Sequence, residues 1–360
     1  MCGIVGYIGN KNGLQTVVRG LERLEYRGYD SAGVAFFNEK KSGPSVIKTV
    51  GRVSSLIPMI KKSSAKPNSA VIGHTRWATH GIPAIVNAHP HVGCQNEIAL
   101  VHNGIIENHD TLRDVLEREG HIFRSETDSE VLVHLIERMI SFGAESFEDA
   151  FREALPHVQG TFGIAAISSR WPQTIIAARR GSPLLVGIGE NSEYIIASDA
   201  SAIAEHTKKV LYLDDDELIS LSPAGHRVFD ISNKTLSKTP ATIDWTIEES
   251  QKSGFPHFMM KEIFEAPEVI ENAFRGRVIA KEGLVKLGGI ERIRGQLEKI
   301  NRIVISACGT SYYAGLVGKY IIESMTRIPV EVAYGSEFRY APQTIDANTL
   351  VIAISQSGET

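Results

Sequence analysis

Hydrophobic positions along the first 240 residues follow two different spacings. Apolar residues three and four apart predict amphipathic helices over residues 14–24, 111–119, 129–140 and 147–155. Short apolar runs bounded by Gly, Pro, Ser or Asp predict strands. These runs cover residues 3–8, 34–37, 71–73, 98–101, 161–167, 174–178, 184–188 and 194–197. Sheets with helices outside them imply an α/β sandwich.

The pattern changes after a polar stretch at residues 236–257, which is the best linker candidate. Beyond it we predict helices over 259–274 and 291–300, a strand at 302–307, a small-residue turn, a long helix through residue 322, and a buried strand at 350–354. A strand, turn and helix in that order indicate a doubly wound parallel sheet. The chain therefore divides into a domain at 1–240, a linker with a helical lead-in at 241–290, and part of a second domain at 291–360.

Composition limits the partners. The 360 residues are 42% hydrophobic and 22% charged, with a formal net charge of -4 and no Lys/Arg block interleaved with aromatic residues, so nucleic acid and membrane surfaces are poor candidates. No apolar run approaches the roughly 18 residues that span a bilayer, and no basic segment followed by an apolar one begins the chain. We expect a cytoplasmic protein whose three cysteines form no disulfide framework.

Cys2 directly follows the initiator methionine, and its small size permits removal of Met1. The residue would then carry both a thiol and a free α-amino group. With a pKa of roughly 7.7 to 8.0, that amine could accept the thiol proton and activate the nucleophile. Alternatively, Cys2 is a small buried residue on the first strand, or a lipidated cysteine, for which an upstream signal segment would be needed.

Polar donors gather in residues 74–81 (HTRWATHG), which we predict to be a loop. Arg76 offers a planar fork that suits an α-carboxylate, and Thr79 and His80 could bond a neighbouring group. Trp77 could cover such a pocket, or it could anchor an ordinary surface loop.

Two further positions carry candidate chemistry. Asn103 and Gly104 end a predicted strand, where a side-chain amide and a backbone N–H could form an oxyanion hole, or simply a turn. Asp128 begins a predicted helix, where its carboxylate could cap the helix or pair with a substrate ammonium. Arg76 and Asp128 together would supply the cation and anion that an amino acid substrate needs.

Histidines raise the question of a metal. Six of the twelve lie between residues 74 and 109, and His89 and His91 have Cys94 nearby. H-x-H is a genuine ligand spacing, but no C-x-x-C, H-E-x-x-H or second carboxylate-rich cluster accompanies it. We therefore expect no metal site.

Two hydroxyl-rich turns mark the second domain, each following a predicted strand. The first is residues 308–311 (CGTS) and the second is residues 355–360 (SQSGET). Exposed N–H groups and hydroxyls at such turns bind phosphate. Neither G-x-x-x-x-G-K-[ST] nor G-x-G-x-x-G is present, so a sugar phosphate is a better ligand than a nucleotide. The Cys308 side chain is read as a core thiol.

Taken together, these motifs resemble a known family. Residues 1–6 (MCGIVG), 25–33 (EYRGYDSAG), 74–81, 102–108 (HNGIIEN) and 125–128 (SETD) closely resemble the class II glutamine amidotransferase domain. Residues 308–311, 336–340 (SEFRY) and 355–360 resemble a sugar isomerase (SIS) domain. The whole chain is thus similar to the N-terminal part of the glutamine–fructose-6-phosphate aminotransferases, whose members continue through the rest of this SIS domain and a second one.

The resemblance implies the four-layer αββα sandwich of N-terminal nucleophile hydrolases, followed by part of a doubly wound SIS domain. It also implies L-glutamine and fructose 6-phosphate as substrates, ammonia passing through an internal channel, no metal or organic cofactor, and a homodimer for the full-length protein. Glucosamine 6-phosphate would be the product. The chain alone is expected to be a glutaminase only.

The resemblance also assigns residues. Cys2 matches the nucleophile, and Asn103 and Gly104 match the oxyanion hole. For glutamine binding the matches are Arg76, Trp77, Thr79, His80 and Asp128, with Trp77 at the channel gate. For the sugar phosphate they are Thr310, Ser311, Ser355, Gln356, Ser357 and Thr360.

Two rival hypotheses come from other classes. A regulatory SIS module with an inert first domain would bind sugar phosphate without releasing glutamate, and would be indifferent to Cys2→Ala. A histidine-rich metallohydrolase would contain stoichiometric zinc and lose activity with a chelator.

Overall fold

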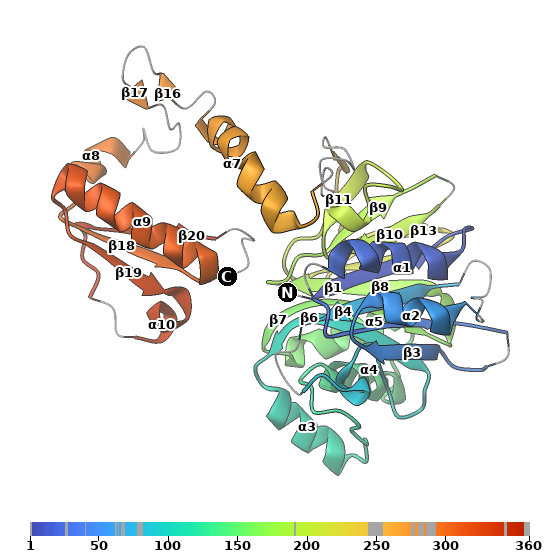
Figure 1. Cartoon of the computed structure of the whole chain (residues 1–360). Helices are drawn as coiled ribbons and strands as arrows, with labels where there is room; N and C mark the ends of the chain where they lie inside the picture. Colours follow the sequence, from blue (N-terminus) through green and yellow to red (C-terminus); the bar gives the residue numbers. More distant parts are fainter. Residues whose placement is uncertain are drawn as a thin grey trace. The chain divides into compact units, whose positions relative to one another are not determined.

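The chain forms two compact units, Met1–Gln251 and Lys252–Thr360, in a computed structural model (Figure 1). It describes residues 2–25, 28–39, 41–61, 63, 65, 69–77, 82–190, 192–243, 255–274, 278–279, 284–285, 293–341 and 344–355. The sequence placed the boundary near residue 240. In the structure residues 241–242 still pair with the first unit's sheet.

Two antiparallel sheets form the centre of the first unit. The eight-stranded sheet has the order β15-β11-β9-β10-β1-β4-β2-β3, and the seven-stranded sheet has the order β14-β13-β12-β8-β7-β6-β5. The first contains β1 (Gly3–Ile8), β2 (Ser31–Phe36), β3 (Ser45–Val50), β4 (Val71–Arg76), β9 (Leu185–Ile188), β10 (Tyr194–Ala197), β11 (Lys209–Tyr212) and β15 (Ala241–Thr242). The second contains β5 (His91–Val92), β6 (Ile98–Ile106), β7 (Gly160–Ser168), β8 (Trp171–Arg180), β12 (Glu217–Ser222), β13 (Gly225–Asp230) and β14 (Thr235–Leu236).

Helices cover the outer faces of both sheets. They are α1 (Gly13–Leu24), α2 (Val53–Ile60), α3 (His109–Arg118), α4 (Glu130–Ser141) and α5 (Phe147–Ala154). One apolar core joins α1 and α2 to the first sheet, a second lies between the sheets, and a third joins the second sheet to α4 and α5. The predicted α/β sandwich is therefore confirmed as four layers, helix, sheet, sheet and helix.

Strand register brings the start of the chain to the end of β4. The central strand β1 lies between β10 and β4, and its antiparallel pairing with β4 sets Gly3 opposite Thr75. Because the two strands run in opposite directions, the residue before β1 and the residue after β4 are neighbours. Cys2 therefore lies beside Trp77.

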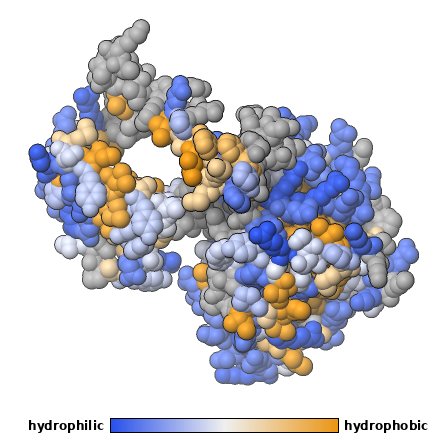
Figure 2. Space-filling model, in the orientation of Figure 1, coloured by the Kyte–Doolittle hydropathy of each residue, from blue (hydrophilic) through white to orange (hydrophobic). Residues whose placement is uncertain are grey.

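The second unit contains a parallel sheet in the order β19-β18-β20, as predicted for a doubly wound fold. Its strands are β18 (Arg302–Ala307), β19 (Val330–Tyr334) and β20 (Thr349–Ile354), and its helices are α7 (Phe258–Phe274), α8 (Arg294–Leu297), α9 (Gly309–Thr326) and α10 (Gly335–Tyr340). The strand pair β16 (Val278–Ile279) and β17 (Leu284–Val285) completes its described elements. Apolar side chains stay exposed along α7 and α9, among them Ile263, Phe264, Tyr320 and Met325 (Figure 2).

Several predicted boundaries were wrong. Strand β4 runs to Arg76 rather than to residue 73, and β6 runs to Ile106 rather than to residue 101, because pairing with β2 and β7 holds polar residues in the sheets. The helix predicted over 291–300 is only Arg294–Leu297 among the described residues. Within that part of the chain, no helix combines the length and apolar character that a membrane crossing requires.

Candidate active site

The Cys2 thiol lies against the backbone of Trp77. The Trp77 amide donates to Sγ at 3.3 Å, and Sγ lies 3.6 Å from the Trp77 carbonyl oxygen. Burial raises the pKa of the Cys2 thiol, and the Trp77 backbone together with the positive charge of Arg76 only partly offsets that rise. The resting sulfur is therefore a thiol, and it needs a base to become a nucleophile.

Asn103 reaches Cys2 from the second sheet. Its Nδ2 donates to the Cys2 carbonyl oxygen at 3.1 Å, and its Oδ1 accepts from His74 Nε2 at 2.9 Å. A primary amide has two N–H groups, so this contact leaves one of them for a ligand. Cys2 and an amide donor thus come together from residues 101 positions apart.

His74 fixes the orientation of that amide. Its Nε2 lies 2.9 Å from Asn103 Oδ1 and 3.0 Å from the His102 carbonyl oxygen, and since both neighbours are acceptors, we assign the proton to Nε2. Burial lowers the pKa of His74 to about 3, so the ring stays neutral. Sequence analysis missed this role. The sequence signal for it was a histidine two residues before Arg76.

Gly104 occupies a position that only glycine fits. Its φ is +134°, and an added Cβ would lie 2.1 Å from the Thr161 carbonyl oxygen. The prediction of a turn here was wrong, because Gly104 pairs with Phe162 inside β6. The glycine follows Asn103 directly, so its backbone lies close to the same site.

Asp128 is buried in front of α4. One carboxylate oxygen accepts from the Ile106 amide at 2.8 Å, and the other lies 3.4 Å from the Ser129 hydroxyl. Asp128 does not cap the helix, because α4 begins at Glu130 and Ser129 is its N-cap residue. No lysine or arginine that the structure describes pairs with this carboxylate. A buried anion is costly without a cation, so the position suits a ligand ammonium.

Arg76 and Trp77 form the end of β4. Arg76 is 4% exposed and Trp77 is 47% exposed, with its ring edge against Tyr29 at 5.5 Å. Gly28 packs under this corner, where an added Cβ would lie 2.7 Å from the Arg76 carbonyl carbon. The predicted loop therefore begins at Trp77 rather than at residue 74. Thr79 and His80 lie outside the described residues.

Four buried histidines lie next to one another beside Asn103: His74, His89, His91 and His102. His89 and His91, whose spacing in the sequence suits metal ligands, both make hydrogen bonds instead. His89 Nδ1 accepts from the His102 amide at 3.2 Å, and His91 Nε2 lies 3.0 Å from the Thr127 hydroxyl. Burial lowers the pKa of all four rings below the usual value of 6.5.

These histidines predict a loss of stability in acid. Their folded-state pKa lies below the unfolded value, so below pH 6.5 the unfolded chain binds more protons and stability falls as the pH falls. For His74, with a pKa of about 3, the loss by pH 5.5 is about 1.4 kcal/mol. We expect urea-unfolding midpoints to drop between pH 7.5 and 5.5, and to drop less in His74→Phe. Exposed His157→Phe is the control. If the urea midpoint drops equally in His74→Phe and His157→Phe, the assignment of His74 as a buried neutral ring is contradicted.

The second candidate site lies at the carboxyl ends of β18 and β20. Register pairs Ala307 with Ile354, so these two strands end side by side. Strand β19 lies on the other side of β18, which makes the gap between β18 and β20 a topological switch point, where open α/β sheets bind ligands. Thr310 and Ser311 lie in the first turn of α9, and Ser355 follows β20. Gln356, Ser357 and Thr360 lie outside the described residues.

Comparison with known proteins agrees with this geometry. Residues 60–238 match the glutamine amidotransferase domain family, and residues 296–360 match the SIS domain family. The glutamine–fructose-6-phosphate aminotransferase (isomerizing) of Chlorobaculum tepidum is 50% identical over the whole chain, and that of Bacteroides thetaiotaomicron is 46% identical. The chain spans 58% of the length of each of these relatives.

Solved structures share the fold. Glutamine phosphoribosylpyrophosphate amidotransferase from B. subtilis, solved with ADP and GMP, has a TM-score of 0.56 at 22% identity, over 92% of this chain and 65% of that one. A structure described as the allosteric regulatory enzyme of purine biosynthesis has a TM-score of 0.57 at 22% identity, over 96% of this chain and 68% of that one. The predicted N-terminal nucleophile hydrolase fold is confirmed.

Proposed function

Because the chain belongs to the glutamine–fructose-6-phosphate aminotransferase family, we propose that its first unit hydrolyses L-glutamine with Cys2 as the nucleophile. The observation that carries the proposal is that the Asn103 amide, which His74 orients, bonds to the backbone of Cys2, the residue that carries the thiol. A sensor domain without chemistry would need neither group.

The thiol needs a base because burial raises its pKa. Removal of Met1 would supply the α-amino group of Cys2 on the same residue. That amine takes the thiol proton, and the thiolate attacks the side-chain amide carbon of glutamine. Ammonia leaves with a proton returned by the ammonium group, and a glutamyl thioester remains. Water then attacks the thioester, which releases glutamate and restores the thiol.

Asn103 and Gly104 stabilise the negative oxygen that forms at each attack. The free N–H of the Asn103 amide and the Gly104 backbone N–H are the donors, and neither has to reorient because His74 and the strand hold them. Each such donor is worth about a hundred- to a thousandfold in rate.

Glutamine is held by its amino acid end. Arg76 supplies the cation for the α-carboxylate, and the buried Asp128 supplies the anion for the α-ammonium. Trp77, whose ring is half exposed beside Cys2, covers the bound side chain. Thr79 and His80 line the same pocket by resemblance alone.

The second unit would receive the ammonia. In the full-length protein we propose transfer to fructose 6-phosphate, which yields glucosamine 6-phosphate. Thr310, Ser311 and Ser355, with Gln356, Ser357 and Thr360, would hold the sugar phosphate at the switch point between β18 and β20.

The experiment is a glutamate-release assay on purified chain whose mass confirms the loss of Met1. A form that retains Met1, made by blocking the peptidase, is run beside it. We expect release only from the processed form, because only that form has the α-amino base. Equal release from both forms would overturn the role of the amine, and release from neither would remove support for a glutaminase in this chain.

A further inference from the structure

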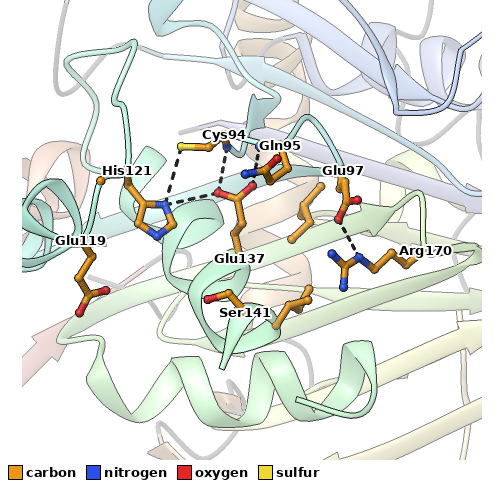
Figure 3. A pocket seen from close by; sticks show the side chains of 11 residues that line it. Cys94, Gln95, Glu97, Glu119, His121, Glu137, Ser141 and Arg170 are labelled. Atoms are coloured by element: carbon orange, nitrogen blue, oxygen red, sulfur yellow. Dashed lines mark hydrogen bonds and ion pairs between the residues drawn. The ribbon is translucent and has the colours of Figure 1, made fainter. Parts of the chain in front are cut away.

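A second cluster of reactive side chains lies away from Cys2, where the β5–β6 hairpin meets α4. It contains Cys94, His121, His134 and Glu137, whose ligand atoms all lie within 4.8 Å of one another. Figure 3 shows the Cys94 sulfur, the His121 ring and the Glu137 carboxylate turned toward one another. The glutamine site uses none of these side chains.

Five of the six distances between the four atoms fall in a narrow range, from 3.3 to 3.8 Å. The Nδ1 atoms of His121 and His134 are 3.3 Å apart, and Cys94 Sγ lies 3.8 Å and 3.6 Å from them. Glu137 Oε2 lies 3.4 Å from His121 Nδ1 and 3.6 Å from His134 Nδ1.

Hydrogen bonding does not account for this arrangement. An imidazole Nδ1 has either one proton or one lone pair, so it makes one well-directed bond. Here each Nδ1 has three polar neighbours at similar distances, and one of those neighbours is the other Nδ1. Four ligand atoms that all lie within 4.8 Å of one another, five of their six separations between 3.3 and 3.8 Å, indicate a common centre.

A tetrahedral zinc ion fits that centre. With Zn–N of about 2.0–2.1 Å and Zn–S of about 2.3 Å, two nitrogens lie about 3.3–3.4 Å apart, and a nitrogen and a sulfur about 3.5–3.6 Å apart. A nitrogen and a carboxylate oxygen lie about 3.3–3.5 Å apart. The five distances given above match these values within about 0.2 Å.

The surroundings of the cluster also suit a metal. The Ile122 amide donates to Cys94 Sγ at 3.2 Å, and the Cys94 amide donates to Glu137 Oε2 at 2.9 Å. His134 Nε2 faces Glu130 Oε1 at 3.6 Å, longer than a hydrogen bond, on the side where metal-bound histidines commonly have an outer carboxylate. A pocket of about 210 Å³ opens onto Cys94, His121 and Glu137 and gives an ion a way in.

We propose that Cys94, His121, His134 and Glu137 bind one zinc ion. Four protein ligands leave no open position, so the ion is structural rather than catalytic. It joins the β5–β6 hairpin to the segment between α3 and α4, which carries His121 at one end and Asp128 at the other. The ion therefore fixes the segment that positions Asp128.

The test is the zinc content of the purified chain, which does not depend on glutamine hydrolysis. We expect about one zinc per chain in the wild type and in Cys308→Ser, a matched cysteine in the second unit, after dialysis against a weak chelator. Cys94→Ser and His121→Ala should hold less than a tenth of that amount. Equal zinc in Cys94→Ser and the wild type, or none in the wild type after dialysis against zinc, would overturn the proposal.

A second measurement covers variants that fold poorly. Wild-type chain stripped by a strong chelator should melt about 5 °C or more lower, and zinc should restore the melting temperature. Cobalt added to the stripped chain should give a thiolate-to-cobalt absorption band that Cys94→Ser lacks. Failure of zinc to raise the melting temperature, or a cobalt spectrum without that band, would contradict the site.

Discussion

Replacing Cys2 by alanine should reduce glutamate release at least about ten-thousandfold, which corresponds to a barrier higher by more than about 5 kcal/mol. The sulfur is the atom that forms the proposed thioester, and the other two cysteines, Cys94 and Cys308, lie elsewhere in the described chain. The fold should survive, because Cys2 precedes β1 and, among the residues that the structure describes, its side chain bonds only to the Trp77 backbone. The measurement is the steady-state rate of glutamate release, with circular dichroism as a check on folding.

Two controls make this result specific. Cys2→Ser keeps the shape of the side chain but replaces the more acidic and more nucleophilic thiol with a hydroxyl, so it should also be strongly impaired. Cys308→Ser changes a half-buried cysteine of the second unit and should keep full glutaminase activity. Activity that survives Cys2→Ala would remove the thioester mechanism and favour a first unit that does no chemistry at Cys2.

Sequence predicted the elements that carry local patterns. The spacing of Leu14, Val17 and Leu21 predicted α1, and the run at 302–307 predicted β18 with its bounds. The predictions failed where pairing with a distant strand decides the structure. Asn103 and Gly104 looked like a turn because an Asn-Gly pair commonly forms one, yet β7 holds both in a strand.

The site residues show the same contrast between features that a local pattern reveals and features that depend on distant contacts. Cys2, Arg76 and Asp128 could be proposed because their side chains match what an amino acid substrate requires. His74 could not, since its role depends on lying 2.9 Å from Asn103 across the two sheets. The Cys94 cluster was missed for a similar reason, because sequence pointed to His89 and His91, whereas folding brings His121 and His134 to the sulfur.

Replacing Asn103 by alanine should lower kcat about a hundred- to a thousandfold and leave KM nearly unchanged. The amide donor acts on an oxygen that becomes negative only during the reaction, so its loss is felt in the transition state rather than in glutamine binding. Asn108→Ala is the matched control, because Asn108 also makes two hydrogen bonds, to His157 and Gln159, without reaching Cys2. Steady-state kinetics of glutamate release separates the two parameters.

The pattern of changes distinguishes a donor from a structural support. If Asn103 acts as a donor, Asn103→Asp should be at least as slow as Asn103→Ala, since a carboxylate would repel the oxyanion and cannot donate when ionised. His74→Phe should lower kcat about tenfold. The Asn103 amide keeps its N–H in this variant but loses the hydrogen bond that orients it. A rise in KM with kcat unchanged in Asn103→Ala would place Asn103 in glutamine binding and leave the oxyanion to Gly104 alone.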